Sequence, residues 1–186
     1  MMLDRYALLK VMREVLGSAA SAYSVNETAR QAGVSVFAAK QGLDYLYAKN
    51  MVLLEKIGTA YQYKANLDNF LTRQWKVLFT LEEIGKAKIV EKILNTKKSI
   101  FSILLYGSAS IGRDDENSDL DILVVADTDE RGKKEMAALS SGTRREINIS
   151  VYTPTEWKRK AASDKIFYEK VLIDSIALYG QKPVVL

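Results

Sequence analysis

Two carboxylates lie close together at the start of an apolar run. Asp119 and Asp121 flank Leu120, and the apolar residues continue to Ala126. Because successive side chains of a β-strand point to opposite faces, both carboxylates project from the same face. Mg²⁺ is bound in proteins by one or two carboxylates together with the phosphates of a substrate. The pair therefore indicates a Mg²⁺ site, although an Asp-x-Asp on its own is more often a solvated turn that enters a strand.

A second feature precedes these carboxylates. Gly107-Ser108 ends the apolar run Ile100–Tyr106, and the polar loop Ala109–Ser118 separates it from Asp119. Glycine lets the backbone approach a phosphate, and a helix that begins after it offers free N–H groups. The two features together predict a phosphate cradle beside the Mg²⁺ site.

The stretch LLYGSASIGRDDENSDLDILVVAD, residues 104–127, resembles the signature of polymerase-β-type nucleotidyltransferases, especially their minimal branch. The shared pattern is an apolar strand, Gly-Ser, a gap, Asp-x-Asp and a second apolar strand. The resemblance is close over about 25 residues and loose over most of residues 99–186.

The resemblance implies a set of binding residues. Gly107 and Ser108 are expected to hold the triphosphate of an NTP, and Arg113 is the only cation of the loop that follows them. Asp119 and Asp121 are expected to hold two Mg²⁺ ions. These ions clamp the in-line attack of an acceptor hydroxyl on the α-phosphate, with pyrophosphate as the leaving group.

Two departures from the family pattern bear on activity. The family carries a third carboxylate on a later strand, here Glu146–Thr153, and matching back from Pro154 places Asn148 at that position. An amide ligates a metal through its carbonyl oxygen but accepts no proton at neutral pH. Glu146 lies on the same strand face and takes this catalytic role if the register differs. The loop after Gly-Ser is also poor in cations, which favours weak triphosphate binding.

These observations leave two functions open. The first is a Mg²⁺-dependent nucleotidyltransferase that moves an NMP from an NTP to an acceptor hydroxyl. The second is a transcription regulator whose impaired nucleotidyltransferase domain senses a nucleotide or a partner protein. The intact Gly-Ser and aspartate pair favour the enzyme, and Asn148 with the cation-poor loop favours the sensor.

The N-terminal part has a different pattern of predicted helices and strands. A helical pattern in Leu3–Leu16 is followed by a short helix capped by Asn26, a turn at Gly33, a helix from Ser35 to about Lys49 and a hairpin across residues 58–60. This order is typical of a winged helix-turn-helix, whose second helix enters the major groove of duplex DNA. A winged helix that only binds protein is the alternative. The expected DNA contacts are Ser35, Val36, Lys40, Gln41, Lys56 and Lys64.

The residues between the N-terminal part and the nucleotidyltransferase-like part are predicted to form connecting helices. Leu71, Trp75, Leu78 and Leu81 form one apolar stripe, typical of an inter-domain or homodimer seam, and Gly85 is expected to end the run. A closing helix is predicted from the spacing of Tyr168, Leu172, Ile176 and Tyr179. We therefore predict an α/β (α+β) chain with a winged helix over 1–66, connecting helices over 67–98 and a small mixed-sheet nucleotidyltransferase-like domain over 99–186.

Composition excludes several classes of site. The chain contains neither cysteine nor histidine, so disulfides, Cys/His zinc sites and Ser-His-Asp triads are impossible. No apolar run approaches the roughly 18 residues of a membrane span, and the absence of cysteine fits a reducing cytoplasm. Residues 1–98 carry 15 Lys and Arg against 9 Asp and Glu, which favours a polyanionic partner for the N-terminal part.

Overall fold

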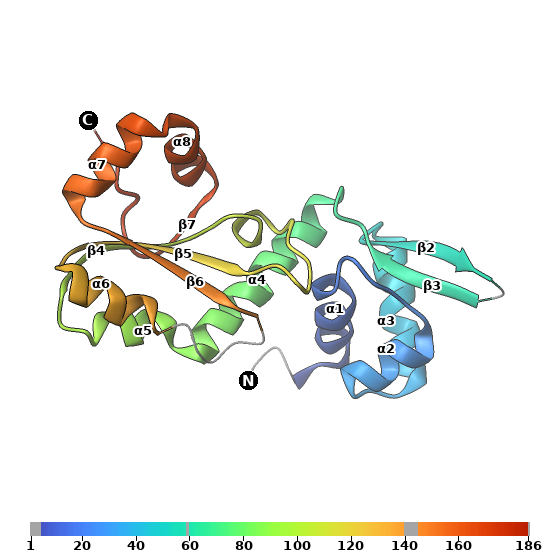
Figure 1. Ribbon diagram of the computed structural model, residues 1–186. Helices are drawn as coiled ribbons and strands as arrows, with labels where there is room; N and C mark the ends of the chain where they lie inside the picture. The colour runs from blue at the N-terminus through green and yellow to red at the C-terminus, as the bar shows by residue number, and fades with distance from the viewer. Residues whose placement is uncertain (1–4, 59, 140–144, 186) are drawn as a thin grey trace. The chain divides into compact units, whose positions relative to one another are not determined.

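The computed structural model describes residues 5–58, 60–139 and 145–185 and has the predicted α/β class, with helices and two sheets (Figure 1). The chain forms two compact units. The N-terminal unit consists of Met1–Phe79 and Gly112–Glu116, and the C-terminal unit of Thr80–Ile111 and Asn117–Leu186. The three-part division into 1–66, 67–98 and 99–186 stays a prediction. Within the described residues, no helix is long and apolar enough to cross a membrane.

The N-terminal unit packs three helices against a small antiparallel sheet of order β1-β3-β2. Its helices and hairpin follow in the predicted order, with one short strand added, and residue 59 of the hairpin lies outside the described residues. Its elements are α1 (Ala7–Gly17), β1 (Ala22–Tyr23), α2 (Val25–Ala32), α3 (Val36–Ala48), β2 (Val52–Ile57) and β3 (Ala60–Ala65). The interpretation as a winged helix-turn-helix stays a prediction.

The caps of α2 and α3 explain their limits. The predicted cap Asn26 is wrong, because Ser24 caps α2 in a reciprocal capping box with Glu27. Serine followed three residues later by glutamate satisfies two free backbone N–H groups, which Asn26 cannot do from inside the first turn. Gly33 ends α2 with a φ of 61°, and Ser35 caps α3, both as predicted.

The helix α4 (Phe70–Ala87) ends later than predicted. It continues through Gly85, where an added Cβ atom would have no neighbour within 4 Å, and ends two residues later. A single glycine costs a helix only about 1 kcal/mol, which the packing of Ile84 and Ala87 offsets. In the predicted stripe, Leu71 and Leu78 are exposed, and its role as an inter-domain or homodimer seam stays a prediction.

The segment Gly112–Glu116 is held inside the N-terminal unit although it follows Gly107-Ser108 in the chain. Asp114 forms a buried ion pair with Lys76 at 3.5 Å, and Lys76 also donates to the backbone oxygen of Leu16. Glu116 accepts hydrogen bonds from the Ser21 hydroxyl at 2.6 Å and from the backbone N–H of Ala20. Although burial opposes them, these bonds hold the pKa of Glu116 below its usual value.

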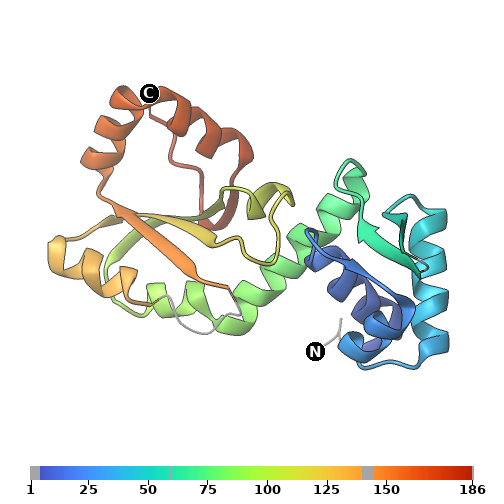
Figure 2. The same cartoon turned by 45° about the vertical axis from the view of Figure 1, so that its right-hand side comes forward.

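The C-terminal unit is built around a four-stranded sheet of order β6-β5-β4-β7. In Figures 1 and 2, α7 and α8 cover one face of this sheet, and α5 and α6 lie on the other. Strands β5 and β6 are parallel, and the other neighbours are antiparallel. The elements are α5 (Ile89–Leu94), β4 (Ser99–Tyr106), β5 (Leu120–Asp127), α6 (Glu130–Ala137), β6 (Ile147–Tyr152), α7 (Pro154–Ser163), α8 (Lys165–Asp174) and β7 (Ile176–Gly180).

The predicted closing helix over residues 168–179 is wrong in its second half. Helix α8 ends at Asp174, and Ile176–Gly180 forms β7, which pairs with β4. The apolar spacing of Ile176 and Tyr179 suits a helix as well as a strand. The free edge of β4, which is a tertiary feature, decides between them because it supplies hydrogen-bond partners to β7.

The buried Lys76–Asp114 pair leads to a test of stability. Asp114→Asn should lower the free energy of unfolding by about 3 kcal/mol, because Lys76 then keeps an uncompensated buried charge. Urea unfolding of the whole chain measures this loss. The control Asp68→Asn removes an exposed carboxylate of the same unit and should change the free energy by no more than about 0.5 kcal/mol. Equal effects of the two substitutions would contradict a structural role for the pair.

Candidate active site

The two aspartates lie at the beginning of β5. Asp121 is the second residue of the strand, and Asp119 immediately precedes it. Leu120, between them, is fully buried in the core that faces α5 and α6. Asp121 therefore shares the opposite face of the sheet with Leu123 and Val125, which pack against Trp157 of α7. Asp119 is exposed and Asp121 half-buried, so the pair is accessible to a ligand on the α7 side.

The parallel pairing of β5 with β6 brings Asn148 to this pair. Asn148 is the register partner of Asp121, and its side-chain amide donates a hydrogen bond of 3.0 Å to Asp119. Burial raises the pKa of Asp121, the charge of Asp119 adds to this effect, and a hydrogen bond from Asn148 opposes it. An amide thus lies beside two carboxylates.

Glu146 is placed differently. It precedes β6, and its backbone oxygen accepts a hydrogen bond from the backbone N–H of Leu120. Its side chain is exposed and makes no hydrogen bond or ion pair to any residue that the structure describes. The structure therefore brings Asn148 rather than Glu146 into contact with the aspartate pair.

Gly107 follows the last residue of β4 and lies directly against Asp121. Its φ is 79°, and a Cβ atom at this position would lie 2.5 Å from a carboxylate oxygen of Asp121. The Ser110 hydroxyl donates to the Gly107 oxygen at 2.8 Å. The helix predicted after Ser108 is wrong, because Ala109–Ile111 forms a single 3₁₀ turn. From residue 112 the backbone belongs to the N-terminal unit, so too few residues remain after Ser108 to form a helix.

The donor set fits a hard divalent cation. The two carboxylates supply oxygen ligands, which is the chemistry that Mg²⁺ prefers, while Asn148 turns its NH₂ group to Asp119. The described residues contain no group of three or more acidic, histidine or cysteine side chains placed to hold a metal. Phosphate oxygens of a substrate would have to complete the coordination. Because Gly107 has no side chain, its backbone lies directly against the Asp121 carboxylate.

The other predicted contacts lie in the N-terminal unit. Arg113 is exposed in the segment Gly112–Glu116, so its predicted contact to a nucleotide stays a prediction. Ser35 is used as the cap of α3, and Lys40 forms an ion pair with Asp44. The remaining predicted DNA contacts are exposed or half-buried, and they are Val36 and Gln41 on α3, Lys56 on β2 and Lys64 on β3.

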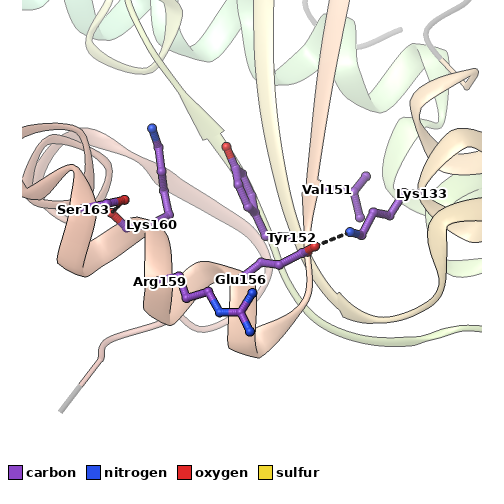
Figure 3. Close-up of a pocket in the computed structure, with 7 residues that line it drawn as sticks. All are labelled: Lys133, Val151, Tyr152, Glu156, Arg159, Lys160 and Ser163. Atoms are coloured by element: carbon purple, nitrogen blue, oxygen red, sulfur yellow. Dashed lines mark hydrogen bonds and ion pairs between the residues drawn. The ribbon is translucent and has the colours of Figure 1, made fainter.

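Sequence reasoning missed four polar residues on the sheet face of the aspartates. Tyr106 pairs with Asp121, and a hydrogen bond links its hydroxyl to Ser150. Burial is the main reason why the pKa of Tyr106 is raised, and the charge of Asp121 adds to it. Tyr152 and Lys160 extend side by side in the same direction (Figure 3). Two signals were available: the alternation of residues 147–152, and the position of Lys160 three residues after Trp157 on the inner side of a helix.

The family comparison agrees with this geometry. Residues 87–173 match the family model of the nucleotidyltransferase domain. The matched segment covers just under half of the chain and includes Gly107, the two aspartates and Asn148. The nucleotidyltransferase part of the sequence resemblance is therefore supported, and the winged-helix part is not tested by it.

Other comparisons add little. The sequence matches no curated protein. A crystal structure of a mutant of the toxin-antitoxin MntA-HpeT is 23% identical with a TM-score of 0.41, covering 52% of this chain and 74% of that chain. A crystal structure of the toxin-antitoxin with AMP-PNP has the same identity and coverages with a TM-score of 0.36. At such identities and TM-scores these structures support no conclusion about function.

The contact between Gly107 and Asp121 gives a prediction for the fold of the site. Gly107→Ala should lower the free energy of unfolding by about 1–3 kcal/mol, because a side chain at this φ is strained and meets the Asp121 carboxylate. Gly85→Ala, in the exposed part of α4, should instead raise it by up to about 1 kcal/mol. Thermal or urea unfolding compares the two. A neutral Gly107→Ala would show that the site does not need this close approach.

Proposed function

We propose that the C-terminal unit carries out Mg²⁺-dependent transfer of an NMP from an NTP to an acceptor hydroxyl. The observation that carries this proposal is the placement of Asp119, Asp121 and Gly107 around one point, inside the segment that matches the nucleotidyltransferase domain. Asp119 and Asp121 would hold Mg²⁺, which neutralises and orients the phosphates of the NTP.

Different residues of the site would bind the triphosphate and take part in the transfer. Gly107 and Ser108 let the backbone approach the triphosphate, and the carboxylates fix its reacting phosphate. The acceptor oxygen forms a bond to the α-phosphorus while the bond to the β-phosphate oxygen breaks, and pyrophosphate leaves. The acceptor proton must leave as well. Asn148 accepts no proton, so proton removal falls to Glu146 or to solvent.

The amide at position 148 also supports a second candidate. If no group removes the acceptor proton, the site binds a nucleotide with Mg²⁺ without turning it over. The chain would then act as a nucleotide sensor or as the binding partner of another protein. The hydrogen bond from Asn148 to Asp119 favours this reading, because the amide already occupies the third position.

A carboxylate introduced at position 148 distinguishes the enzyme from the nucleotide sensor. With labelled NTPs and Mg²⁺, Asn148→Asp should raise transfer of label by about 10²–10⁴-fold, the usual contribution of a positioned base. The affinity for the NTP should stay nearly unchanged, and Glu146→Gln should have little effect. The double variant Asp119→Ala/Asp121→Ala serves as the control and should bind no Mg²⁺-nucleotide. If Glu146→Gln abolishes transfer instead, Glu146 is the base.

Two results would overturn the enzyme proposal. If the native chain and both variants transfer no label from any NTP but bind nucleotide, the sensor is the correct function. If neither the native chain nor the double aspartate variant binds an NTP in calorimetry with Mg²⁺, the nucleotide site itself is wrong.

We further propose that the N-terminal unit is a winged helix that binds duplex DNA. Its support is the element order with α3 after the Gly33 turn and the exposure of Val36, Gln41 and Lys56. A protein partner of this surface is the alternative. The lysines are few, so the electrostatic contribution of phosphate contacts is modest.

Salt dependence tests the DNA proposal. Three phosphate contacts predict that the affinity of the whole chain for duplex DNA falls about 40-fold between 50 and 200 mM salt. Lys56→Gln/Lys64→Gln should weaken binding and flatten this dependence. Lys158→Gln/Lys170→Gln, an equal change of charge in the C-terminal unit, should do neither. The absence of a gel shift even at about 50 mM salt would point to a protein-binding winged helix.

A further inference from the structure

Polar side chains continue from the aspartates along one face of the sheet. On β6, Asn148, Ser150 and Tyr152 are the register partners of Asp121, Leu123 and Val125. The alternate residues of β6 are apolar and pack into the core on the other face. The polar face is therefore confined to the α7 side of this strand, where an edge strand of a helix-covered sheet would ordinarily bury apolar residues.

Tyr106 connects these residues to the aspartates. It lies opposite Asp121 on β4, and its hydroxyl bonds to Ser150. Tyr106, Ser150 and Tyr152 are all partly exposed. We call these three residues and Lys160 the polar row. Four hydrogen-bonding groups thus lie along one surface that begins at the aspartate pair.

Lys160 places a positive charge at the end of the polar row. The ammonium group donates to Asp164 at 2.7 Å and lies 4.9 Å from the centre of the Phe167 ring. Its charge acts on the hydroxyls of both Tyr106 and Tyr152. An ion pair and an aromatic ring already restrict the rotamers of this lysine. A ligand that binds it therefore causes a smaller further loss of side-chain entropy.

A pocket of about 330 Å³ opens at this end of the row (Figure 3). Its lining contains three cations, Lys133, Arg159 and Lys160, and one carboxylate, Glu156. Glu156 is engaged by Lys133 at 2.5 Å, which lowers its pKa to about 2. Arg159 forms no ion pair with any described residue. Because Lys133 is paired with Glu130 and Glu156, and Lys160 with Asp164, the positive charge of the lining that no described carboxylate pairs with is that of Arg159. The lining also contains the hydroxyls of Tyr152 and Ser163.

The direction of the row distinguishes it from the triphosphate cradle. Gly107 follows Tyr106 at the end of β4, beyond the Asp121 pair. Ser150 and Tyr152 of β6 pair with Leu123 and Val125, which lie two and four residues after Asp121 on β5, in the opposite direction. From Asn148 to Tyr152 the distance along the strand is about 13 Å. A molecule on the row therefore meets the aspartates from the side opposite Gly107-Ser108.

We propose that the polar row and its pocket bind the acceptor, and that this acceptor carries a phosphate group. This inference rests on the proposed nucleotidyl transfer. Lys160 contacts the phosphate together with the hydroxyls of Tyr152 and Ser163, while Tyr106 and Ser150 bind the part that leads to the reacting hydroxyl. Phosphate fits better than a carboxylate because it offers more acceptor oxygens and up to two charges to this set of donors.

Binding of inorganic phosphate to the whole chain tests the subsite. Titration is followed in ¹H–¹⁵N spectra with AMP-PNP and Mg²⁺ present at saturation. Phosphate should shift the amide signals of α7 and leave AMP-PNP bound. Lys160→Gln should weaken phosphate binding about tenfold or more, as expected for a hydrogen bond to a charged group. Lys160→Arg should restore most of it, and AMP-PNP affinity should not change in either variant.

Lys158→Gln provides the matched control. It removes one exposed positive charge from the same helix, outside the pocket lining, and should leave phosphate binding unchanged. Dispersed spectra of each variant show that it is folded. If Lys158→Gln and Lys160→Gln weaken phosphate binding equally, the effect is general electrostatics and the subsite is refuted.

The remaining outcomes separate this inference from the proposed function. If phosphate displaces AMP-PNP, or if Lys160→Gln weakens AMP-PNP, Lys160 belongs to the nucleotide site and the acceptor assignment is wrong. If phosphate produces no shift in α7 while AMP-PNP binds, the subsite is wrong and the proposed function stands. If AMP-PNP fails to bind while phosphate binding still depends on Lys160, the proposed function is overturned and only the anion site remains.

Discussion

The site depends on the register of β5 with its two neighbours. Antiparallel pairing sets Tyr106 opposite Asp121, and parallel pairing sets Asn148 opposite the same residue. Because side chains alternate along a strand, a slip of one residue in either ladder would turn a whole set of polar groups to the other face. The apolar core of Leu120 and Ile122 on that face resists such a slip, since it would expose them. The hydrophobic pattern thus positions the carboxylates.

This register gives Asn148 its importance. A hydrogen bond to Asp119 makes the amide a structural partner of the aspartate pair, while its chemistry denies the site a base at that place. The site thus keeps the aspartate pair and Gly107 but has an amide where the family pattern has a third carboxylate. Enzyme and sensor therefore differ by one functional group, and the surrounding geometry suits both.

The two faces of β6 differ in polarity. One face contributes Ile147, Ile149 and Val151 to the core, and the other carries the polar row. Partly buried hydroxyls are costly unless they are hydrogen-bonded, and the bond between Tyr106 and Ser150 meets that need. Helix α7 combines both roles, because Trp157 anchors it in the core and Lys160 faces the row.

Several features of the protein follow from the sequence alone. Gly107, Asp119 and Asp121 could be predicted because local spacing places them on neighbouring turns and strand ends, and matching back from Pro154 found Asn148. The α/β class and most helices and strands follow from periodicity and caps. What periodicity could not decide was pairing. Residues 176–180 form a strand because β4 has a free edge with which they pair. The β5–β6 register brings Asn148, rather than Glu146, to the aspartates. Residues 114–116 pack in the N-terminal unit because Asp114 pairs with Lys76 and Glu116 accepts a hydrogen bond from Ser21. Such contacts join residues far apart in the chain, and only the tertiary structure brings them together.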